Sequence, residues 1–183
     1  MSEKPYAPRI AETVEQILDR RARFLAVEAE GEQVSDLVEL LLFRINEEWY
    51  AVKLTDVREI FQDFEITSIP CVPDYVLGVT SVRGEILSVT DPARLMSLGN
   101  TVSDAGVSLP AVVITDGTVA TALVVAQIGE IAEVGVDSFE PPVSIIDRAQ
   151  AEFMAGSAYA GGHMVGLLDV ERVLKPIGGK SSS

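Results

Sequence analysis

Two aspartates are the side chains in this sequence best suited to chemistry. A pair of carboxylates can serve as general acid and general base in a hydrolase. However, Asp91 and Asp169 each directly precede a short predicted helix, where an aspartate commonly caps the first turn. They also occupy matching positions in two similar segments of the chain. We therefore expect two helix caps and no shared catalytic centre.

The single histidine and the single cysteine also lack suitable neighbours. His163 has no cysteine or second histidine at ligand spacing, so no metal site is predicted. Cys71 lies between Pro70 and Pro73 without a neighbouring base that could activate it, and we expect a buried, inert thiol. Nucleotide-binding loops and the Gly-x-Ser-x-Gly elbow are missing from the sequence. We predict a protein that is not an enzyme and needs no cofactor.

One arginine, Arg83, occupies a predicted turn whose backbone geometry does not require an arginine. Residues 75–91 read YVLGVTSVRGEILSVTD, with an apolar run on each side of Arg83 and Gly84, which predicts a β-hairpin. Glycine suits the turn because it adopts positive φ without a Cβ clash. Turn geometry does not explain Arg83. It is either a solvated turn residue or a side chain displayed for a partner.

The composition excludes several classes of function. Of the 183 residues, 28 are acidic and 14 are basic, giving a net charge of −14, which disfavours binding to nucleic acids and to anionic membranes. No basic start followed by an apolar run marks a signal peptide, and no apolar stretch reaches the length of a membrane span. A lone cysteine suits a reducing compartment. We predict a cytoplasmic protein without membrane insertion.

The chain is predicted to begin with a helical extension. Apolar residues at helical spacing predict an amphipathic helix over residues 10–25, within an extension of residues 1–34. We expect its apolar face to dock on its own domain, and a partner-binding helix is the alternative. The last residues, 179–183, are predicted to form a disordered tail.

The remainder of the chain is predicted to be rich in strands. We expect a short helix over residues 55–61 with Thr55 as its N-cap, and a two-residue Asp-Gly turn at 116–117. The other predicted elements are a strand over 37–45 with no fully wet face, its hairpin partner at 49–54, the hairpin of 75–91, a helix after Asp91, the hairpin of 111–125, a strand at 130–136, a hairpin across Gly161 and Gly162, and a helix after Asp169.

An internal repeat underlies this pattern. A shift of 78 positions places Gly78 on Gly156 and Gly84 on Gly162, and it also places Asp91 on Asp169. The shared order of strand, glycine turn, strand and cap indicates a duplication. We therefore predict two similar β-barrel subdomains, roughly residues 35–108 and 109–178, within one domain of residues 35–178.

Several motifs together resemble the CheW-like domain of bacterial chemosensory systems. They are VREI, GVTSVRG, an aspartate seven residues after Gly84, VVITDG followed by ALVV, and GLLDVERVL, spanning about residues 37–175. The resemblance implies a mainly β fold of two five-stranded SH3-like or OB-like barrels. It also implies a non-catalytic adaptor at receptor arrays, which joins the cytoplasmic tip of methyl-accepting chemoreceptors to the regulatory domain of a CheA-type histidine kinase.

The resemblance also assigns roles to individual residues. It implies that Arg83 takes part in receptor coupling, with Glu59 as the carboxylate that orients it. The complete implied set is Arg83, Glu59, Ala111 and Val112 for receptor coupling, and Val57, Gly78 and Thr80 for kinase contact. The chain has Ser81, Ser88 and Pro92 where the family often has asparagine, proline and an aliphatic residue.

Three alternative functions are also considered. The same fold could serve a non-flagellar chemosensory pathway, with twitching motility or a second messenger as its output. From another class, a small-molecule-binding β-barrel sensor or hydrolase would use a cleft between the barrels, with Asp91, Asp169 and His163 as its candidate groups. An OB-like nucleic-acid binder is disfavoured by the charge.

Overall fold

The computed structural model describes residues 36–101, 108–142 and 147–178. The helix predicted over residues 10–25, the extension of residues 1–34 and the tail of residues 179–183 lie outside these ranges and stay predictions. The description below concerns the compact unit that begins at Leu37.

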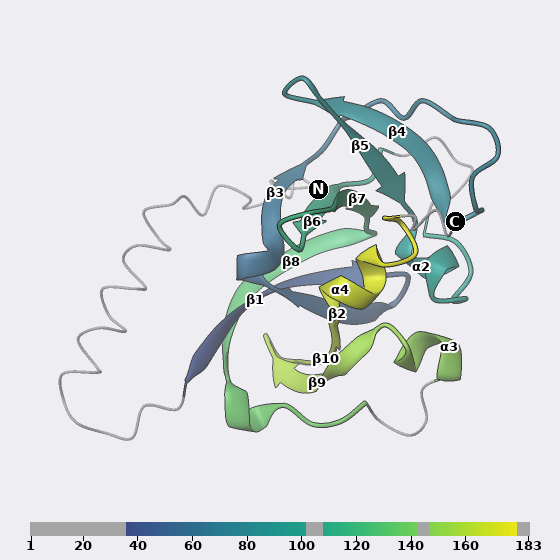
Figure 1. The fold of residues 1–183 in the computed structure, drawn as a ribbon. Helices are drawn as coiled ribbons and strands as arrows, with labels where there is room; N and C mark the ends of the chain where they lie inside the picture. Colours follow the sequence, from purple (N-terminus) through teal and green to yellow (C-terminus); the bar gives the residue numbers. More distant parts are fainter. Residues whose placement is uncertain (1–35, 102–107, 143–146, 179–183) are drawn as a thin grey trace, which may run out of the picture. The chain divides into compact units, whose positions relative to one another are not determined.

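Ten strands form two five-stranded sheets within this unit (Figure 1). Sheet A has the order β8-β1-β2-β10-β9, and sheet B has the order β3-β6-β7-β5-β4. The strands are β1 Leu37–Ile45, β2 Glu48–Lys53, β3 Val57–Phe61, β4 Val76–Val82, β5 Glu85–Thr90, β6 Ala111–Thr115, β7 Ala120–Val124, β8 Gln127–Gly135, β9 Met154–Ala160 and β10 His163–Leu168. The short helices are α2 Pro92–Leu95, α3 Arg148–Ala151 and α4 Val170–Leu174, and the 3-10 turns are η1 Leu54–Asp56 and η2 Val136–Ser138.

The two halves of the chain exchange hairpins. Sheet A combines the first hairpin, β1–β2, with β8, β9 and β10 from the second half, and sheet B combines β6–β7 with β3, β4 and β5 from the first half. The two sheets therefore do not follow the predicted division into residues 35–108 and 109–178. Equivalent strands hold equivalent places, as the repeat predicted. The exchange creates one parallel seam in each sheet, β2 with β10 and β5 with β7.

Exchanged strands are buried on both faces. In β1, Leu40 and Leu42 pack into the core of sheet A. The intervening side chains, Leu41, Phe43 and Ile45, pack into a central core shared with α2, α4 and sheet B. Burial of each such side chain stabilises the fold by about 1.5–3 kcal/mol. This two-sided burial explains the apolar run of β1 and confirms that the strand has no fully wet face.

The repeat extends to the edges of both sheets. Chain beyond β3 forms a bridge from Thr67 to Val79 in β4, and chain beyond β8 forms a bridge from Glu140 to Ser157 in β9. These bridges bring the backbone so close that a Cβ on Gly78 would lie 2.2 Å from the Thr67 carbonyl oxygen. A Cβ on Gly156 would lie 2.6 Å from the Glu140 carbonyl oxygen. A side chain would collide with backbone at both positions, which explains why Gly78 and Gly156 are both glycine.

Both predicted aspartate caps are confirmed. The backbone N–H of Ala93 donates to Asp91 Oδ1 at 3.0 Å, and that of Arg172 donates to Asp169 Oδ1 at 3.2 Å. A matching arginine contacts each cap, since Arg94 Nε lies 3.4 Å from Asp91 and Arg172 Nε lies 3.3 Å from Asp169. The capping predicted for α2 and α4 thus has the same chemistry in both halves.

Several local predictions were wrong. Residues 55–61 form the end of η1 and strand β3, because pairing of Ile60 and Phe61 with β6 outweighs the local helical pattern. Four residues, 116–119, connect β6 to β7, and Asp116 accepts hydrogen bonds from the backbone N–H groups of Thr118 and Val119. Cys71 is exposed, whereas burial was predicted. Helix α3 was not predicted at all.

The close approach at Gly78 gives a sharp stability test. Gly78→Ala should destabilise the protein by about 4 kcal/mol or more, because a Cβ there collides with rigid backbone at a φ of +150°. Gly84→Ala is the matched control, since Gly84 has a φ of +81° and nothing within 4 Å of a Cβ. It should cost only about 1–2 kcal/mol. Urea unfolding of both variants measures the difference, and equal losses would contradict the account.

The hairpin exchange predicts that neither half folds by itself. A fragment ending at residue 108 lacks the partners of β1–β2, and a fragment starting at residue 109 lacks those of β6–β7. Each fragment should give the dispersionless NMR spectrum of an unfolded chain. An equimolar mixture should recover dispersed signals. A fragment that folds alone with native shifts would overturn the exchange.

Candidate partner-binding site

The turn between β4 and β5 holds its arginine in a strained conformation. Arg83 and Gly84 form a two-residue loop with φ values of 51° and 81°, the combination of a type I′ turn. The equivalent turn between β9 and β10 has Gly161 and Gly162, with φ values of 57° and 81°. A non-glycine residue in the left-handed region costs about 1–2 kcal/mol. Sheet B therefore retains a side chain where the backbone favours glycine.

Glu59 in β3 lies beside this arginine. Arg83 Nε and Glu59 Oε2 are 3.6 Å apart, and the side chains are 84% and 17% exposed. Pairing of β3 with β6 sets the position of Glu59 opposite Val113, after a bulge at Arg58. The structure thus brings together the two residues for which the resemblance implied a common role. A largely buried carboxylate thus lies at ion-pair distance from an exposed guanidinium.

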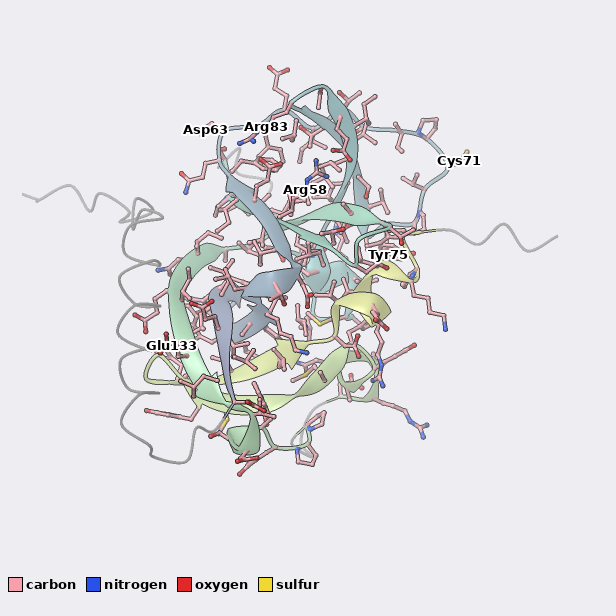
Figure 2. The ribbon with its side chains drawn as sticks, turned by 60° about the vertical axis from the view of Figure 1, so that its left-hand side comes forward. Arg58, Asp63, Cys71, Tyr75, Arg83 and Glu133 are labelled. Carbon is pink, nitrogen blue, oxygen red and sulfur yellow. The ribbon has the colours of Figure 1, made fainter. Side chains whose placement is uncertain are left out.

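A second ion pair lies next to the first. Arg58 Nη2 donates a hydrogen bond to Glu85 Oε2, and Glu85 directly follows the turn glycine. Hydrogen bonding to Glu85 raises the pKa of Arg58, and the same hydrogen bond lowers the pKa of Glu85. Both groups therefore stay charged at neutral pH. We call Arg58, Glu59, Arg83 and Glu85 the crest cluster; Figure 2 shows Arg58 and Arg83 at this end of the protein.

An exposed apolar side chain adjoins the crest cluster. Ile86 follows Glu85 in β5 and is 72% exposed, opposite the exposed Ser81 of β4. Neither Ile86 nor Arg58 was predicted as a site residue. Sequence features could have identified both residues, since Ile86 lies on the outward side of a predicted strand beside the turn and Arg58 directly precedes Glu59. Because successive strand residues point to opposite faces, the crest offers Glu85 on one face of β5 and Ile86 on the other.

The residues implied in kinase contact are mostly internal. Gly78 packs its backbone against Thr67, and Thr80 is 5% exposed. Val57 is half-buried at the start of β3, where it packs against the central core. These three residues shape the two edge strands of sheet B, β3 and β4. Of the three, Val57 offers the most accessible side chain.

Ala111 and Val112 lie beneath the surface. Both side chains are fully buried in β6, where Ala111 pairs with Phe61 and Val112 pairs with Ile60. They cannot present their side chains to a partner in this conformation. Their pairing fixes the strand that carries Glu59. Any part that they play in coupling is therefore indirect.

The groups considered for catalysis are engaged elsewhere. Asp91 is fully buried and accepts hydrogen bonds from the backbone N–H groups of Ala93 and Thr101. Asp169 caps α4, and His163 stacks on Trp49 with ring centroids 4.7 Å apart. Across residues 36–101, 108–142 and 147–178, no cluster of His, Cys, Asp or Glu is suited to hold a metal ion. None of the helices in those ranges is long and apolar enough to cross a membrane.

Comparison with known proteins identifies the family. The family model for the CheW-like domain matches residues 39–177, which include both sheets and the crest cluster. This chain belongs to the CheW-like domain family. The resemblance to the CheW-like domain is thereby confirmed.

Relatives and solved structures agree with this assignment. The chain is 26% identical over 144 residues to the chemotaxis protein CheW of Klebsiella aerogenes, covering 79% of this chain and 84% of the relative. It is 28% identical over 155 residues to the protein FrzA of Myxococcus xanthus, covering 84% and 92%. The crystal structure of the scaffolding protein TtCheW from Thermoanaerobacter tengcongensis has a TM-score of 0.64 at 25% identity, covering 73% of this chain and 90% of that one. The predicted mainly β fold is confirmed.

The exposed ion pair predicts that Arg83 contributes little to stability. Arg83→Gly removes a pair whose arginine is 84% exposed, worth about 0–1 kcal/mol. It also relieves the left-handed strain of about 1–2 kcal/mol, and the greater freedom of glycine in the unfolded chain cancels part of that gain. The free energy of unfolding should change by less than about 1 kcal/mol. A loss above about 2 kcal/mol in urea unfolding would show that Arg83 serves the fold itself.

Proposed function

We propose that this CheW-like protein is a non-catalytic adaptor that couples methyl-accepting chemoreceptors to a CheA-type histidine kinase. It binds the receptor at the receptor's cytoplasmic tip, and it binds the kinase at the kinase's CheW-like regulatory domain. The adaptor works in the cytoplasm, at receptor arrays. Support comes from the family match, the names of the relatives and the crest geometry.

The conformation and surroundings of Arg83 are the main support for receptor coupling. A side chain maintained in a left-handed turn, where the second half of the chain uses glycine, is retained for a use other than folding. Glu59 restricts the directions that the guanidinium can take, so less entropy is lost when it binds. On the outward face of β5, two residues after the turn, Ile86 supplies apolar surface that a receptor helix can bury. The crest therefore combines an oriented donor with an apolar anchor.

The edge strands of sheet B are the proposed kinase surface. Val57 stands at the start of β3, and Gly78 and Thr80 set the course of β4. Because Gly78 and Thr80 are buried, they act through the shape of the strand. Ala111 and Val112 act in the same indirect way on receptor coupling, through the position of β3.

A rigid scaffold can transmit the position of one bound partner to the other. Each sheet contains strands from both halves, and the central core joins them. A displacement imposed at the crest is therefore passed to the rest of the unit without local unfolding. In this mechanism the adaptor transmits relative position and carries out no chemical step.

A second chemosensory output is the nearest alternative. Similarity to FrzA extends over 84% of this chain, a share larger than that of the Klebsiella CheW. A CheW-like scaffold in a non-flagellar pathway, with twitching motility or a second messenger as its output, would use the same surfaces. Identification of the bound receptor and kinase distinguishes the two outputs.

The coupling role predicts the effect of reversing the charge at the crest. Arg83→Glu should keep the fold and lower receptor-dependent kinase activation by about tenfold or more, because loss of one charged hydrogen bond at a desolvated contact costs about 1.5–3 kcal/mol. Kinase autophosphorylation in reconstituted receptor membranes measures it. Arg148→Glu, at an exposed position in α3, is the matched control and should leave activation unchanged.

Two further measurements complete this test. The charge-swapped pair Arg83→Glu with Glu59→Arg should restore the ion pair without restoring activation, because the receptor contact needs the arginine at the turn. A tagged full-length chain should recover a histidine kinase and a chemoreceptor from native cell extract. Full activation by folded Arg83→Glu, or recovery of neither partner, would contradict the proposed function.

A further inference from the structure

A pocket of about 320 Å³ opens on sheet A, beside the parallel seam of β2 and β10. It belongs to the half of the fold that does not carry the crest cluster, and none of the implied partner-contact residues lines it. Its principal walls are Glu48, Tyr50, Gln150, Met154, Met164 and Gly166.

The side chains of Met154 and Tyr50 pack directly over the backbone of Gly166 in this seam. Gly166 pairs with Tyr50, and a Cβ on Gly166 would lie 2.6 Å from Met154 Cε and 3.2 Å from Tyr50 Cδ1. At the equivalent place in sheet B, Ser88 pairs with Thr121, and their hydroxyl groups are hydrogen-bonded at 2.8 Å. The repeat thus places hydroxyl groups over one seam and the side chains of Met154 and Tyr50 over the other.

A fixed carboxylate forms the polar wall of the pocket. The Tyr50 hydroxyl donates to Glu48 Oε2 at 2.7 Å, and the Gln150 amide donates to the same oxygen at 3.3 Å. Gln150 also donates to the Tyr50 hydroxyl oxygen. Burial, followed by the hydrogen bond and charge of Glu48, raises the pKa of Tyr50, so the phenol remains a donor at physiological pH. Glu48 is exposed, and these bonds engage only its Oε2.

The neighbouring wall already binds a guanidinium from the chain itself. Trp49 and His163, which also line the pocket, stack at an interplanar angle of 17°. The Arg44 guanidinium carbon lies 6.0 Å from the Trp49 ring centroid, and Arg44 Nη2 pairs with Glu47 at 2.8 Å. A carboxylate beside an aromatic ring is thus a working guanidinium site in this protein. Glu48 places a second carboxylate in the pocket that the Trp49 and His163 rings also line.

We propose that this pocket binds an arginine side chain presented by a partner protein. Glu48 accepts from the guanidinium and Met164 lies beside its aliphatic stem, while Met154 and Tyr50, 3% and 1% exposed, form the buried floor of the pocket. Lysine is a poorer occupant, because its ammonium has no flat face to lie against an aromatic ring. Met164 is 58% exposed and Tyr159, its cross-strand neighbour, is 68% exposed, which gives the partner backbone an apolar rim.

Titration of the full-length protein with a minimal probe tests the pocket. The probe is N-acetyl-arginine N-methylamide, followed by ¹⁵N NMR, and its uncharged citrulline counterpart is the control ligand. The arginine compound should shift the backbone amides of Tyr50 and Gly166, and the citrulline compound should bind at least about tenfold more weakly. This result is independent of receptor coupling, because the crest cluster does not contribute to it.

Matched variants decide whether Glu48 is the anion. Glu48→Gln should weaken the arginine probe by about tenfold or more, and Glu171→Gln, exposed on α4, should leave binding unchanged. Met164→Lys places a cation at the rim and should weaken binding even if Glu48→Gln does not fold. Equal shifts with both ligands, or unchanged binding in folded Glu48→Gln or Met164→Lys, would overturn the proposal.

Discussion

The exchange of hairpins between the two halves is the constraint on which the rest of the structure depends. Because β1–β2 completes one sheet and β6–β7 completes the other, neither sheet is assembled from consecutive chain. The exchanged strands must then be apolar on both faces, since one face packs within its sheet and the other enters the central core. This burial joins two small sheets, each too small to be stable alone, into one unit.

The same constraint leaves the turns at the ends of the sheets free to differ. Cap positions and the close-packed glycines repeat closely, as Asp91 with Asp169 and Gly78 with Gly156 show. The two β-turns, in contrast, carry Arg-Gly in one sheet and Gly-Gly in the other. One seam holds paired hydroxyl groups and the other borders a pocket. Duplicated backbones thus support different surfaces, which is what an adaptor with several partners requires.

The sequence predicted local features well where their cause was local. The caps at Asp91 and Asp169 and the turn at Gly84 each follow from a few adjacent residues. Residues 55–61 were assigned to a helix because their pattern is helical, whereas their pairing with β6 is a long-range contact. The exchange of hairpins also depends on long-range contacts, and hydrophobic periodicity in the sequence does not reveal it. The burial of Ala111 and Val112 likewise depends on which strands lie beside β6.

Hydrogen exchange of the full-length protein, free and assembled with its receptor and kinase, tests the central claim most directly. The claim is that a rigid, exchanged scaffold works through surface groups at its crest. Protection should increase at the amides of Glu59, Gly84 and Ile86, while amides in the seams of β2 with β10 and of β5 with β7 exchange as slowly as before. Faster exchange along the seams, or no added protection at the crest, would contradict the account.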